Sequence, residues 1–302
     1  MTLARVLSAI GRTLITAGVL ILLFVAYQLW GTGISQRRSQ HQLASQFAET
    51  LATASTTTSS TTTTTVASGS TVATAPPSTA PALVDELLEG DPMGRIVIPK
   101  LHLDAIVVEG VDLGDLKKGP GHYPDTPLPG QDGNAAIAGH RTTYGAPFGN
   151  VDQLDNGDEI LVTTVQGKFT YEVADKQVVA PNQVEVLDDY GDNRLTLTSC
   201  EPKYSARRRI IIVAMLKGKA LPATASTGTV EPGHSTLGLS GERAPRLPAI
   251  LWGLAAATVW FLAWLLGRRW RKWAAYAIGL PVFLVVLFVF FENFSRLLPA
   301  NY

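Results

Sequence analysis

Three long apolar segments constrain the fold of this 302-residue chain more than any other feature. They run from Leu14 to Trp30, from Leu247 to Leu266 and from Ala274 to Phe291. Each has about the 17–25 residues with which a helix crosses a bilayer. A tract rich in Ser and Thr fills much of 52–82, which leaves about 91–219 for one packed domain. We therefore expect a membrane protein with a single globular domain, and not a soluble cytosolic enzyme.

The charged residues beside these segments predict their orientation. Arg5 and Arg12 precede the first segment, and Arg268-Arg269-Trp270-Arg271-Lys272 separates the second from the third. Such clusters mark the cytoplasmic side of a membrane, although Arg37 and Arg38 then fall outside. No small-x-small cleavage site follows the first segment, so we expect an uncleaved anchor. The domain then lies on the extracellular face of a multi-pass plasma membrane protein.

The resulting division of the chain has six parts. We expect a cytoplasmic N-terminus and membrane anchor (1–36), a Ser/Thr-rich extracellular linker (37–90), the globular domain (91–219), a tether (220–246), a transmembrane helical hairpin (247–291) with its cytoplasmic basic loop (268–272), and a short extracellular tail (292–302). The linker sequence from Thr53 to Ala80 has no charge and no aromatic residue, so it has too little apolar surface to fold alone.

Charge and cysteine usage exclude several classes of function. The chain has 25 Lys+Arg and 25 Asp+Glu, of which 14 and 18 respectively lie between Asp91 and Lys219. The domain is mildly acidic and has no basic face, which argues against nucleic-acid binding. The single cysteine excludes a disulfide within the chain. We find no glycine-rich phosphate loop and no His/Cys/Glu group with metal-ligand spacing, so we expect no cofactor and no metal.

The globular segment has the short apolar runs of β-strands instead of helical periodicity. In the run 194–199, Leu195 and Leu197 fall on one face while Thr196 and Thr198 fall on the other. Many short strands with turn signals between them predict a closed or nearly closed antiparallel β-barrel. We expect the strands at 95–98, 105–109, 135–138, 158–165, 168–179, 194–199 and 208–216.

Three residues at strand ends are candidates for chemistry. Cys200 ends the 194–199 run, and His140 follows the short run that ends at Ala138. Arg209 opens the next strand after Cys200, so an antiparallel pair of strands would place the two side by side. Taken singly, each has an ordinary interpretation, because a lone cysteine is usually a small buried hydrophobe and a loop-edge histidine or arginine is usually solvated.

Together these residues indicate nucleophilic acyl transfer. An imidazolium lowers the pKa of a nearby thiol and supplies the reactive thiolate. A fixed guanidinium stabilises the oxyanion that develops at the attacked carbonyl. Arg207 has the same strand parity as Arg209 and is the alternative for this last role.

The motifs around these residues resemble the sortase family. Thr196-Leu197-Thr198-Ser199-Cys200 resembles the TLxTC signature, with Ser199 where threonine is usual. Ala138-Gly139-His140-Arg141 resembles the histidine-bearing strand end, and Arg209 with Ile210 to Ala214 resembles the arginine strand. The stretch from Gly121 to Phe148 is most similar to class E sortases of actinobacteria. The resemblance covers about 95–217 and implies that 91–219 is a sortase catalytic domain with an eight-stranded barrel.

The resemblance also implies an activity and a set of roles. Sortases are cysteine transpeptidases that cleave a C-terminal sorting motif between Thr and Gly and pass the protein to an amine, often on a cell-wall precursor. Cys200 would be the nucleophile, His140 the general acid and base, and Arg209 the oxyanion ligand. Tyr123 would favour LAxTG over LPxTG, and Thr198 and Ser199 would line the substrate site. The expected partners are secreted proteins with a sorting signal, a cell-wall amine and membrane lipid.

Other interpretations stay open from the sequence. Within enzymes, a pilin-polymerising sortase would carry a lid, and Asp91-Pro92-Met93 resembles such a lid without its aromatic residue. A thiol protease would hydrolyse without transfer. A non-catalytic, membrane-tethered wall-binding module would make Cys200 dispensable. Leu221 to Ala225 (LPATA) resembles a sorting signal, but we interpret it as part of the flexible tether.

Overall fold

A computed structural model describes residues 3–59, 87–223, 245–269, 272–295 and 297. The chain divides into two units, which are described separately. One comprises residues 1–34 and 243–301, and the other comprises 35–242.

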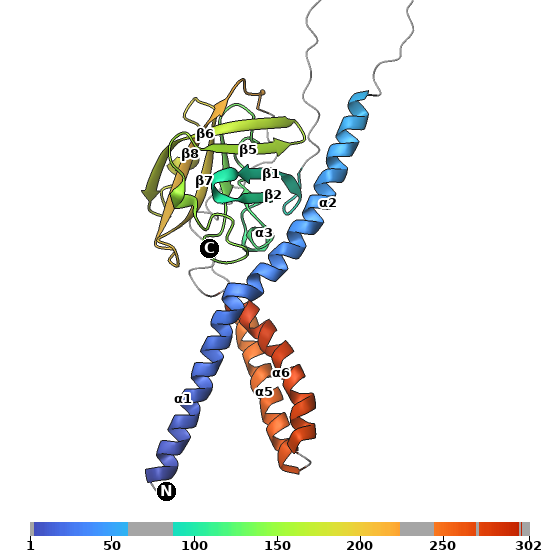
Figure 1. Ribbon diagram of the computed structural model, residues 1–302, viewed down its shortest axis with the longest axis vertical. Helices are drawn as coiled ribbons and strands as arrows, with labels where there is room; N and C mark the ends of the chain where they lie inside the picture. The colour runs from blue at the N-terminus through green and yellow to red at the C-terminus, as the bar shows by residue number, and fades with distance from the viewer. Residues whose placement is uncertain (1–2, 60–86, 224–244, 270–271, 296, 298–302) are drawn as a thin grey trace, which may run out of the picture. The chain divides into compact units, whose positions relative to one another are not determined.

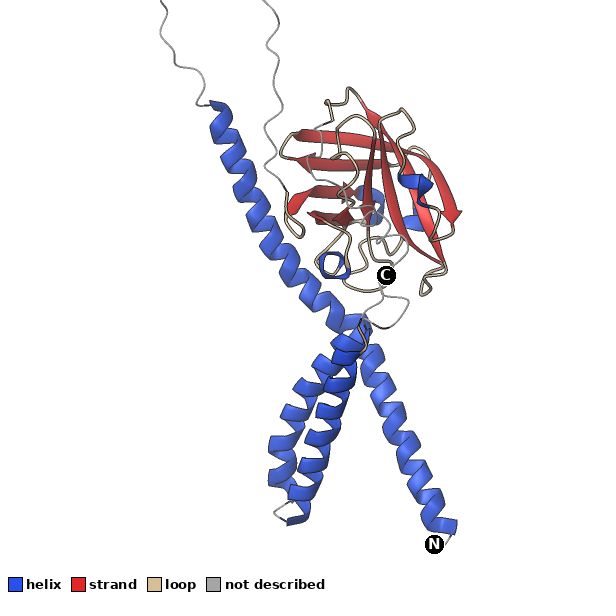
Figure 2. Cartoon of the chain, turned by 180° about the vertical axis from the view of Figure 1, so that it is seen from behind, coloured by secondary structure: helices blue, strands red, loops and turns tan. Residues whose placement is uncertain are grey.

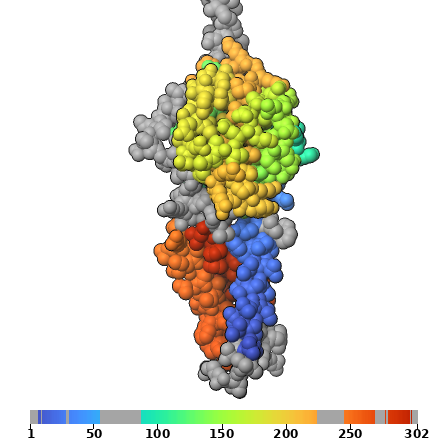
Figure 3. Space-filling model, turned by 90° about the vertical axis from the view of Figure 1, so that its left-hand side faces the viewer, coloured from blue at the N-terminus to red at the C-terminus, as the bar shows by residue number. Residues whose placement is uncertain are grey.

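The second unit contains the expected β-barrel (Figures 1 and 2). Eight strands close in the order β1-β2-β3-β4-β7-β8-β6-β5. In the space-filling view of Figure 3, yellow and lime-green residues of the part of the chain that contains β5 and β6 face the viewer. Strand β6 pairs with β5 on one side and with β8 on the other. Short helical turns connect the strands, among them α3 (Leu113–Leu116). The strands are β1 (Pro92–Ile98), β2 (Leu103–Glu109), β3 (Gly121–His122), β4 (Asn134–Ala138), β5 (Glu159–Thr164), β6 (Gly167–Val179), β7 (Arg194–Glu201) and β8 (Arg208–Lys217).

Two features of the sheet differ from the expected antiparallel barrel. The pairs β2–β3 and β4–β7 are parallel, whereas the other pairs are antiparallel. Strand β3 was not expected at all, because its residues Gly121 and His122 follow Gly119-Pro120, which reads as a turn. The parallel β4–β7 pair matters for function, because parallel neighbours end at the same edge of a sheet.

The alternation expected in β7 is confirmed, with both faces buried. Leu195 and Leu197 are fully buried in the barrel interior. Thr196 and Thr198 face the other way and are buried as well. A second apolar cluster that includes Tyr123 and Ile211 covers this outer face. Each large side chain buried in this way contributes about 1.5–3 kcal/mol. Polar groups on the outer face of β7 therefore lie in a dry layer between the barrel wall and its covering loops.

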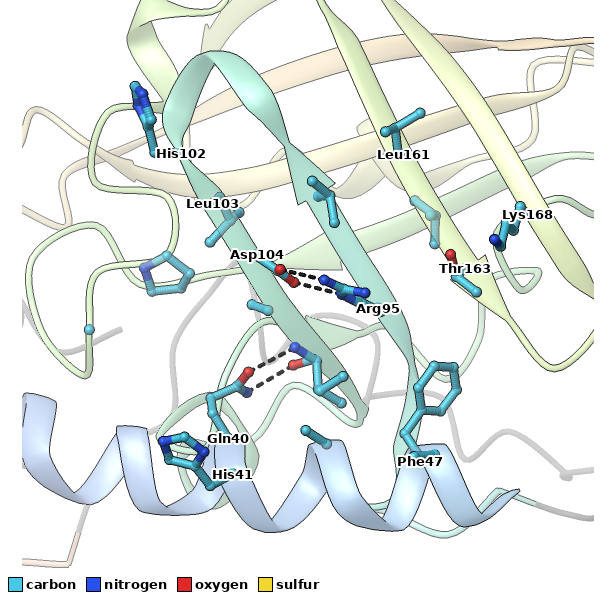
Figure 4. A pocket seen from close by; sticks show the side chains of 18 of the residues that line it. Gln40, His41, Phe47, Arg95, His102, Leu103, Asp104, Leu161, Thr163 and Lys168 are labelled. Atoms are coloured by element: carbon cyan, nitrogen blue, oxygen red, sulfur yellow. Dashed lines mark hydrogen bonds and ion pairs between the residues drawn. The ribbon is translucent and has the colours of Figure 1, made fainter. Parts of the chain in front are cut away.

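Helix α2 (Thr32–Ser59) packs on the barrel through residues that belong to the same unit (Figure 4). Leu43 and Phe47, one helical turn apart, are buried with Ile106 and Val108 of β2. The Gln40 side chain donates to the carbonyl oxygens of Ile106 and Lys118, both at 2.9 Å, and accepts from the Ile106 N–H at 2.7 Å. The side-chain amide thus pairs with both backbone groups of Ile106, as a residue of a neighbouring strand would. A cavity of about 1010 Å³ lies between the helix and the barrel.

The expected start of an extracellular linker at residue 37 falls inside α2. The helix continues to Ser59 because 35–52 is rich in good helix formers and places Leu43 and Phe47 on one face. The Ser/Thr composition that marks a linker begins after this stretch. Most of the tract, residues 60–86, lies outside the described residues.

The first unit is helical. Helix α1 (Leu3–Ala26) ends in a π-helical turn (Tyr27–Gly31), and α5 (Leu247–Arg269) and α6 (Lys272–Ser295) form a hairpin. Among the described residues one helix, Leu247–Arg268, is long and apolar enough to cross a membrane. Two shorter apolar stretches, Ile10–Ala26 and Gly279–Ser295, lie in α1 and α6. The predicted helices are present, but three membrane spans are not confirmed and remain a prediction.

The structure locates the lid-like segment at 91–93 and the first residue of the segment that resembles a sorting signal. Met93 lies in β1 and is buried in the barrel core, so Asp91-Pro92-Met93 begins a strand and forms no lid. Leu221 is held by backbone hydrogen bonds to Gly130 and Asp132 at 2.8 Å each. Thr224 and Ala225, together with Trp270 and Arg271 of the basic loop, lie outside the described residues.

Candidate active site

Cys200 and Arg209 lie directly opposite each other. Strands β7 and β8 are antiparallel, and their register pairs Cys200 with Arg209. Cys200 is 4% exposed and Arg209 is 2% exposed. Both lie at the end of the strand pair, beside the loop that joins the two strands. The expectation that adjacent antiparallel strands would bring them together is confirmed.

His140 reaches the same edge from the other side of β7. The parallel register of β4 and β7 pairs Ala138 with Thr198. Beyond it, the Gly139 N–H donates to the Thr198 carbonyl at 3.1 Å, and the Ser199 hydroxyl donates to the Gly139 carbonyl at 2.7 Å. His140 therefore follows β4 alongside Cys200. His140 precedes Cys200 by 60 positions, and Arg209 follows it by 9. All three meet at one edge because β7 pairs with β4 in parallel and with β8 in antiparallel.

The environment favours the uncharged forms of the thiol and the imidazole. Burial raises the pKa of the Cys200 thiol, and the guanidinium groups of Arg209 and Arg141 offset part of this effect. Burial, with a smaller contribution from Lys117, lowers the pKa of His140 to about 4. At neutral pH the resting pair is thus thiol and imidazole. The thiolate–imidazolium form is a minority state that a proton transfer must create.

The two candidate arginines are in different environments. Arg209 is buried and donates from Nη1 to the carbonyl oxygens of Ala206 and Arg208, at 3.1 and 3.2 Å. These bonds to its own loop fix the guanidinium beside the thiol. Arg207 is exposed and precedes the first residue of β8. The geometry therefore supports Arg209 over Arg207 as the cation of the site.

The expected substrate-lining residues lie in the wall behind Cys200. Tyr123 is fully buried, and its hydroxyl lies 3.1 Å from the hydroxyl of Thr198. Burial raises the pKa of Tyr123 well above its ordinary value, which keeps this phenol protonated. Thr198 and Ser199 are buried too, and the Ser199 hydroxyl is bonded to Gly139. In this structure these groups brace the site instead of forming an open surface.

The sequence-based prediction gave no role to Arg141, which links the two halves of the site. It is buried and donates to the Cys200 carbonyl at 2.9 Å. The same guanidinium pairs with Glu201 at 2.8 Å and with Asp152 at 2.7 Å. The residue after the candidate base is thereby tied to the backbone of the candidate nucleophile. A single arginine after a histidine carries no sequence signal for this role.

A second buried histidine, His122, was also missed. Its Nδ1 lies 2.9 Å from a Glu109 carboxylate oxygen, and its Nε2 lies 3.0 Å from the Pro127 carbonyl. A carbonyl only accepts, so Nε2 carries a proton. Burial would lower the pKa of His122, but the Glu109 carboxylate and the bond to Pro127 outweigh it, and the pKa is raised. The adjacent Tyr123 is held through its carbonyl by the Thr126 hydroxyl at 2.8 Å.

One group of carboxylates in the described residues has the spacing of a cation site. Oxygens of Glu89, Asp112 and Asp115 lie within 4.8 Å of one another. Lys118 already pairs with Asp115 at 2.8 Å. Carboxylates alone do not define a metal site, and no cofactor role is assigned to them.

The barrel segment is similar to known proteins. The sortase domain family matches residues 96–217, which is nearly the whole barrel. Sortase SrtE1 of Streptomyces coelicolor is 33% identical over 220 residues, or 68% of this chain and 55% of that protein. Sortase D of Bacillus subtilis is 33% identical over 37% of this chain and 56% of that protein. The solved structure of sortase E from Streptomyces avermitilis is 38% identical, covering 43% of this chain and 91% of that one, with a TM-score of 0.40.

The closed barrel thus brings a cysteine, a histidine and an arginine to one strand edge. The chain belongs to the sortase family, and within it is similar to the class E members of Streptomyces coelicolor. It spans about half the length of the first two curated relatives that it matches.

Proposed function

We propose that this protein is a membrane-anchored cysteine transpeptidase. It would cleave a C-terminal sorting motif of the LAxTG or LPxTG type between Thr and Gly and join the protein to a cell-wall amine. The observation that supports this best is the register of three strands. It pairs Cys200 with Arg209 across β7 and β8, and it brings His140 alongside from β4.

The first half of the reaction forms a thioester. His140 accepts the proton of Cys200, and the thiolate attacks the threonine carbonyl. Arg209 stabilises the negative charge that develops on the carbonyl oxygen. The imidazolium of His140 then protonates the departing glycine nitrogen, the C–N bond breaks, and the acyl group stays on Cys200. This sequence needs a neutral histidine at rest, in agreement with the lowered pKa of His140.

The second half reverses the roles. An incoming amine attacks the thioester carbonyl, and His140 takes its proton. Arg209 again stabilises the oxyanion. The C–S bond breaks, Cys200 recovers a proton from His140, and a new amide leaves. The net reaction exchanges one amide for another, so it requires no metal and no redox cofactor.

The remaining assignments belong to the same proposal. Tyr123, Thr198 and Ser199 would shape the wall that receives the sorting motif, with Tyr123 favouring LAxTG. The apolar helices would anchor the protein as a multi-pass plasma membrane protein with the barrel on the extracellular face. Exposed apolar side chains on α1 and α5 support the anchor, because large residues such as Leu14, Leu22, Leu254 and Phe261 are all more than half exposed.

The test uses the full-length chain in detergent micelles with LAxTG and LPxTG reporter peptides and diglycine as the amine. We expect an amide product in which diglycine replaces the C-terminal half of the peptide. The Cys200→Ala variant is expected to lose at least about 10⁴-fold in turnover, because it removes the nucleophile.

Two controls sharpen this experiment. Arg209→Lys keeps a charge but loses the fixed fork, and we expect it to lower kcat about 10²-fold. Arg207→Lys changes an exposed cation outside the strand and is expected to change turnover less than about twofold. Turnover that survives Cys200→Ala would reject the proposed chemistry. Equal losses in the two arginine variants would reject the assignment of Arg209.

A further inference from the structure

The imidazole of His140 is sealed from solvent in an unusual way. The side chain is 1% exposed, and neither ring nitrogen has a hydrogen-bond partner among the residues that the structure describes. Buried polar groups are nearly always paired, so this exception needs an explanation. In the proposed reaction this imidazole passes protons between a thiol, a peptide nitrogen and an incoming amine, yet in the structure it is shielded from water.

Tyr144 provides the seal. Its ring centroid lies 5.1 Å from that of His140, with the planes inclined by 39°, and the side chain is 3% exposed. The Lys117 ammonium lies 5.7 Å from the centroid of the Tyr144 ring. The Tyr144 ring therefore lies close to both the candidate base and a cation, and that cation contributes to the low pKa of His140.

The backbone that presents Tyr144 is strained. Tyr144, Gly145 and Ala146 have φ values of 50°, 75° and 46°. Three successive residues thus occupy the left-handed region, although two of them carry a Cβ. Such outliers persist where their surroundings enforce them, and they gather at functional sites and switch regions.

The contacts on the two sides of the loop 144–146 differ, and they indicate which part of the loop is fixed and which part has space to move. Gly145 has a φ of 75°, which favours glycine, and a Cβ built there would lie 2.6 Å from the terminal amide of the Gln36 side chain of α2. On the other flank, Phe148 is fully buried and its N–H donates to the His140 carbonyl at 3.1 Å. Gly145 and Pro147 also line the cavity between α2 and the barrel. The loop therefore has a fixed base and open space beside its tip.

The geometry points to Tyr144 as a water-excluding gate that decides between aminolysis and hydrolysis of the acyl-enzyme. This inference rests on the proposed function. A thioester reacts with an amine to give an amide and a thiol, or with water to give a carboxylic acid and a thiol. In both reactions His140 must take the proton of the nucleophile. A closed gate leaves no room for water at that imidazole, whereas an amine on a larger acceptor brings binding energy that can displace the ring.

Tyr144 is thus a positioning residue and touches no reacting atom. The expected readout is the ratio of amide to acid product, because both products come from the same acyl-enzyme and the ratio is independent of how much protein is folded. In full-length protein with an LAxTG peptide and diglycine, we expect Tyr144→Ala to lower this ratio by about tenfold or more. Tyr144→Phe keeps the ring and is the matched control, expected to stay within about twofold.

A second measurement keeps the inference testable without turnover. With the seal removed, the pKa of His140 is expected to rise from about 4 towards its ordinary value of 6.5, measured by NMR titration of the imidazole. Tyr144→Phe is expected to leave it low. An unchanged product ratio, or an unchanged pKa of His140 in folded Tyr144→Ala, would overturn the gate. Absence of any Cys200-dependent product from the wild type would instead overturn the proposed function, and the pKa measurement would still decide the gate.

Discussion

His122 and His140 are both 1% exposed in the same barrel unit, yet their surroundings are opposite. His122 has an acceptor at each ring nitrogen, the Glu109 carboxylate and the Pro127 carbonyl. His140 has neither, and faces Tyr144 and the charge of Lys117. Accordingly the pKa is raised for His122 and lowered for His140.

The comparison shows that a buried histidine can have a structural or a chemical role, depending on its hydrogen-bond partners. A histidine with an acceptor at each ring nitrogen favours its protonated form, because losing a proton would break one of its bonds. A histidine with no partner retains its capacity to accept a proton from a new neighbour. Burial alone does not point to a catalytic group, whereas an unsatisfied buried base at a strand edge beside a cysteine makes His140 the candidate for the proposed general base.

The largest effect expected from this comparison is on turnover. His140→Gln is expected to lower kcat about 10³–10⁴-fold, because it removes the general acid and base. His122→Gln is expected to lower kcat less than about tenfold per active molecule, while destabilising the barrel by about 3 kcal/mol through the loss of a buried charge partner. Peptide turnover normalised by thiol titration of Cys200 gives the first quantity, and hydrogen exchange in β7 and β8 gives the second.

The matched substitutions make the result decisive. If His122→Gln removed turnover as completely as His140→Gln in folded protein, the division into a structural and a catalytic histidine would be wrong. Tryptophan fluorescence is unsuitable for following the barrel, because all six tryptophans lie outside 91–219.

Some of this arrangement was accessible from the sequence alone. Cys200 and Arg209 flank a short loop between two strands, so antiparallel pairing predicts their contact. The alternation of Leu195 and Leu197 with Thr196 and Thr198 predicts which residues enter the core. These inferences depend on local periodicity and on nearest-neighbour pairing, which a sequence records directly.

Other parts depend on contacts that no local pattern records. The parallel β4–β7 pair joins segments about 60 residues apart, and the two-residue β3 is too short to show alternation. Arg141 and His122 resemble any surface cation until their buried partners are known. The packing of α2 on the barrel was not predicted from the sequence. Its contact residues Gln40, Leu43 and Phe47 precede a low-complexity tract that has the composition of a linker, and the whole segment was assigned to that linker.

The next largest effect is on the pH dependence of stability. The pKa of His140 is lowered, so this residue contributes stability that is present above pH 6.5, the unfolded value, and is lost as pH falls towards about 4. The size is about 3 kcal/mol, at 1.36 kcal/mol per pKa unit. The pKa of His122 is raised, so its contribution is complete below pH 6.5 and is lost as pH rises through the raised value.

Each contribution is isolated by comparing the wild type with one histidine variant across pH. The stability difference between wild type and His140→Gln is expected to shift in favour of the variant between pH 6.5 and 4. The difference for His122→Gln is expected to shift in favour of the variant above pH 6.5. Hydrogen exchange at several pH values, corrected for intrinsic rates, measures both. If both variants gained stability relative to the wild type at the same end of the pH range, the assignment of opposite charge states would be wrong.

The smallest expected effect separates charge from hydrogen bonding at His122. Glu109→Gln keeps a side-chain partner at Nδ1 and removes the negative charge. We expect the pKa of His122 to fall, because burial then acts without the opposing carboxylate. The ring becomes neutral, with its Nε2 proton still donated to the Pro127 carbonyl. Stability at pH 7 is expected to change by less than about 1 kcal/mol, since a neutral buried pair can replace an ionic one at little loss.

The contrast variant is Glu109→Ala, which leaves His122 buried without its charge partner. We expect it to lose about 1–3 kcal/mol, because the now neutral ring keeps a buried Nδ1 that has lost its hydrogen-bond partner. NMR titration of His122 and hydrogen exchange in β7 distinguish the two variants. Equal losses would mean that the carboxylate charge itself holds the Tyr123 segment in place. A small loss in Glu109→Gln alone would mean that the geometry of the two hydrogen bonds is sufficient, and that the charge of His122 follows from its partners.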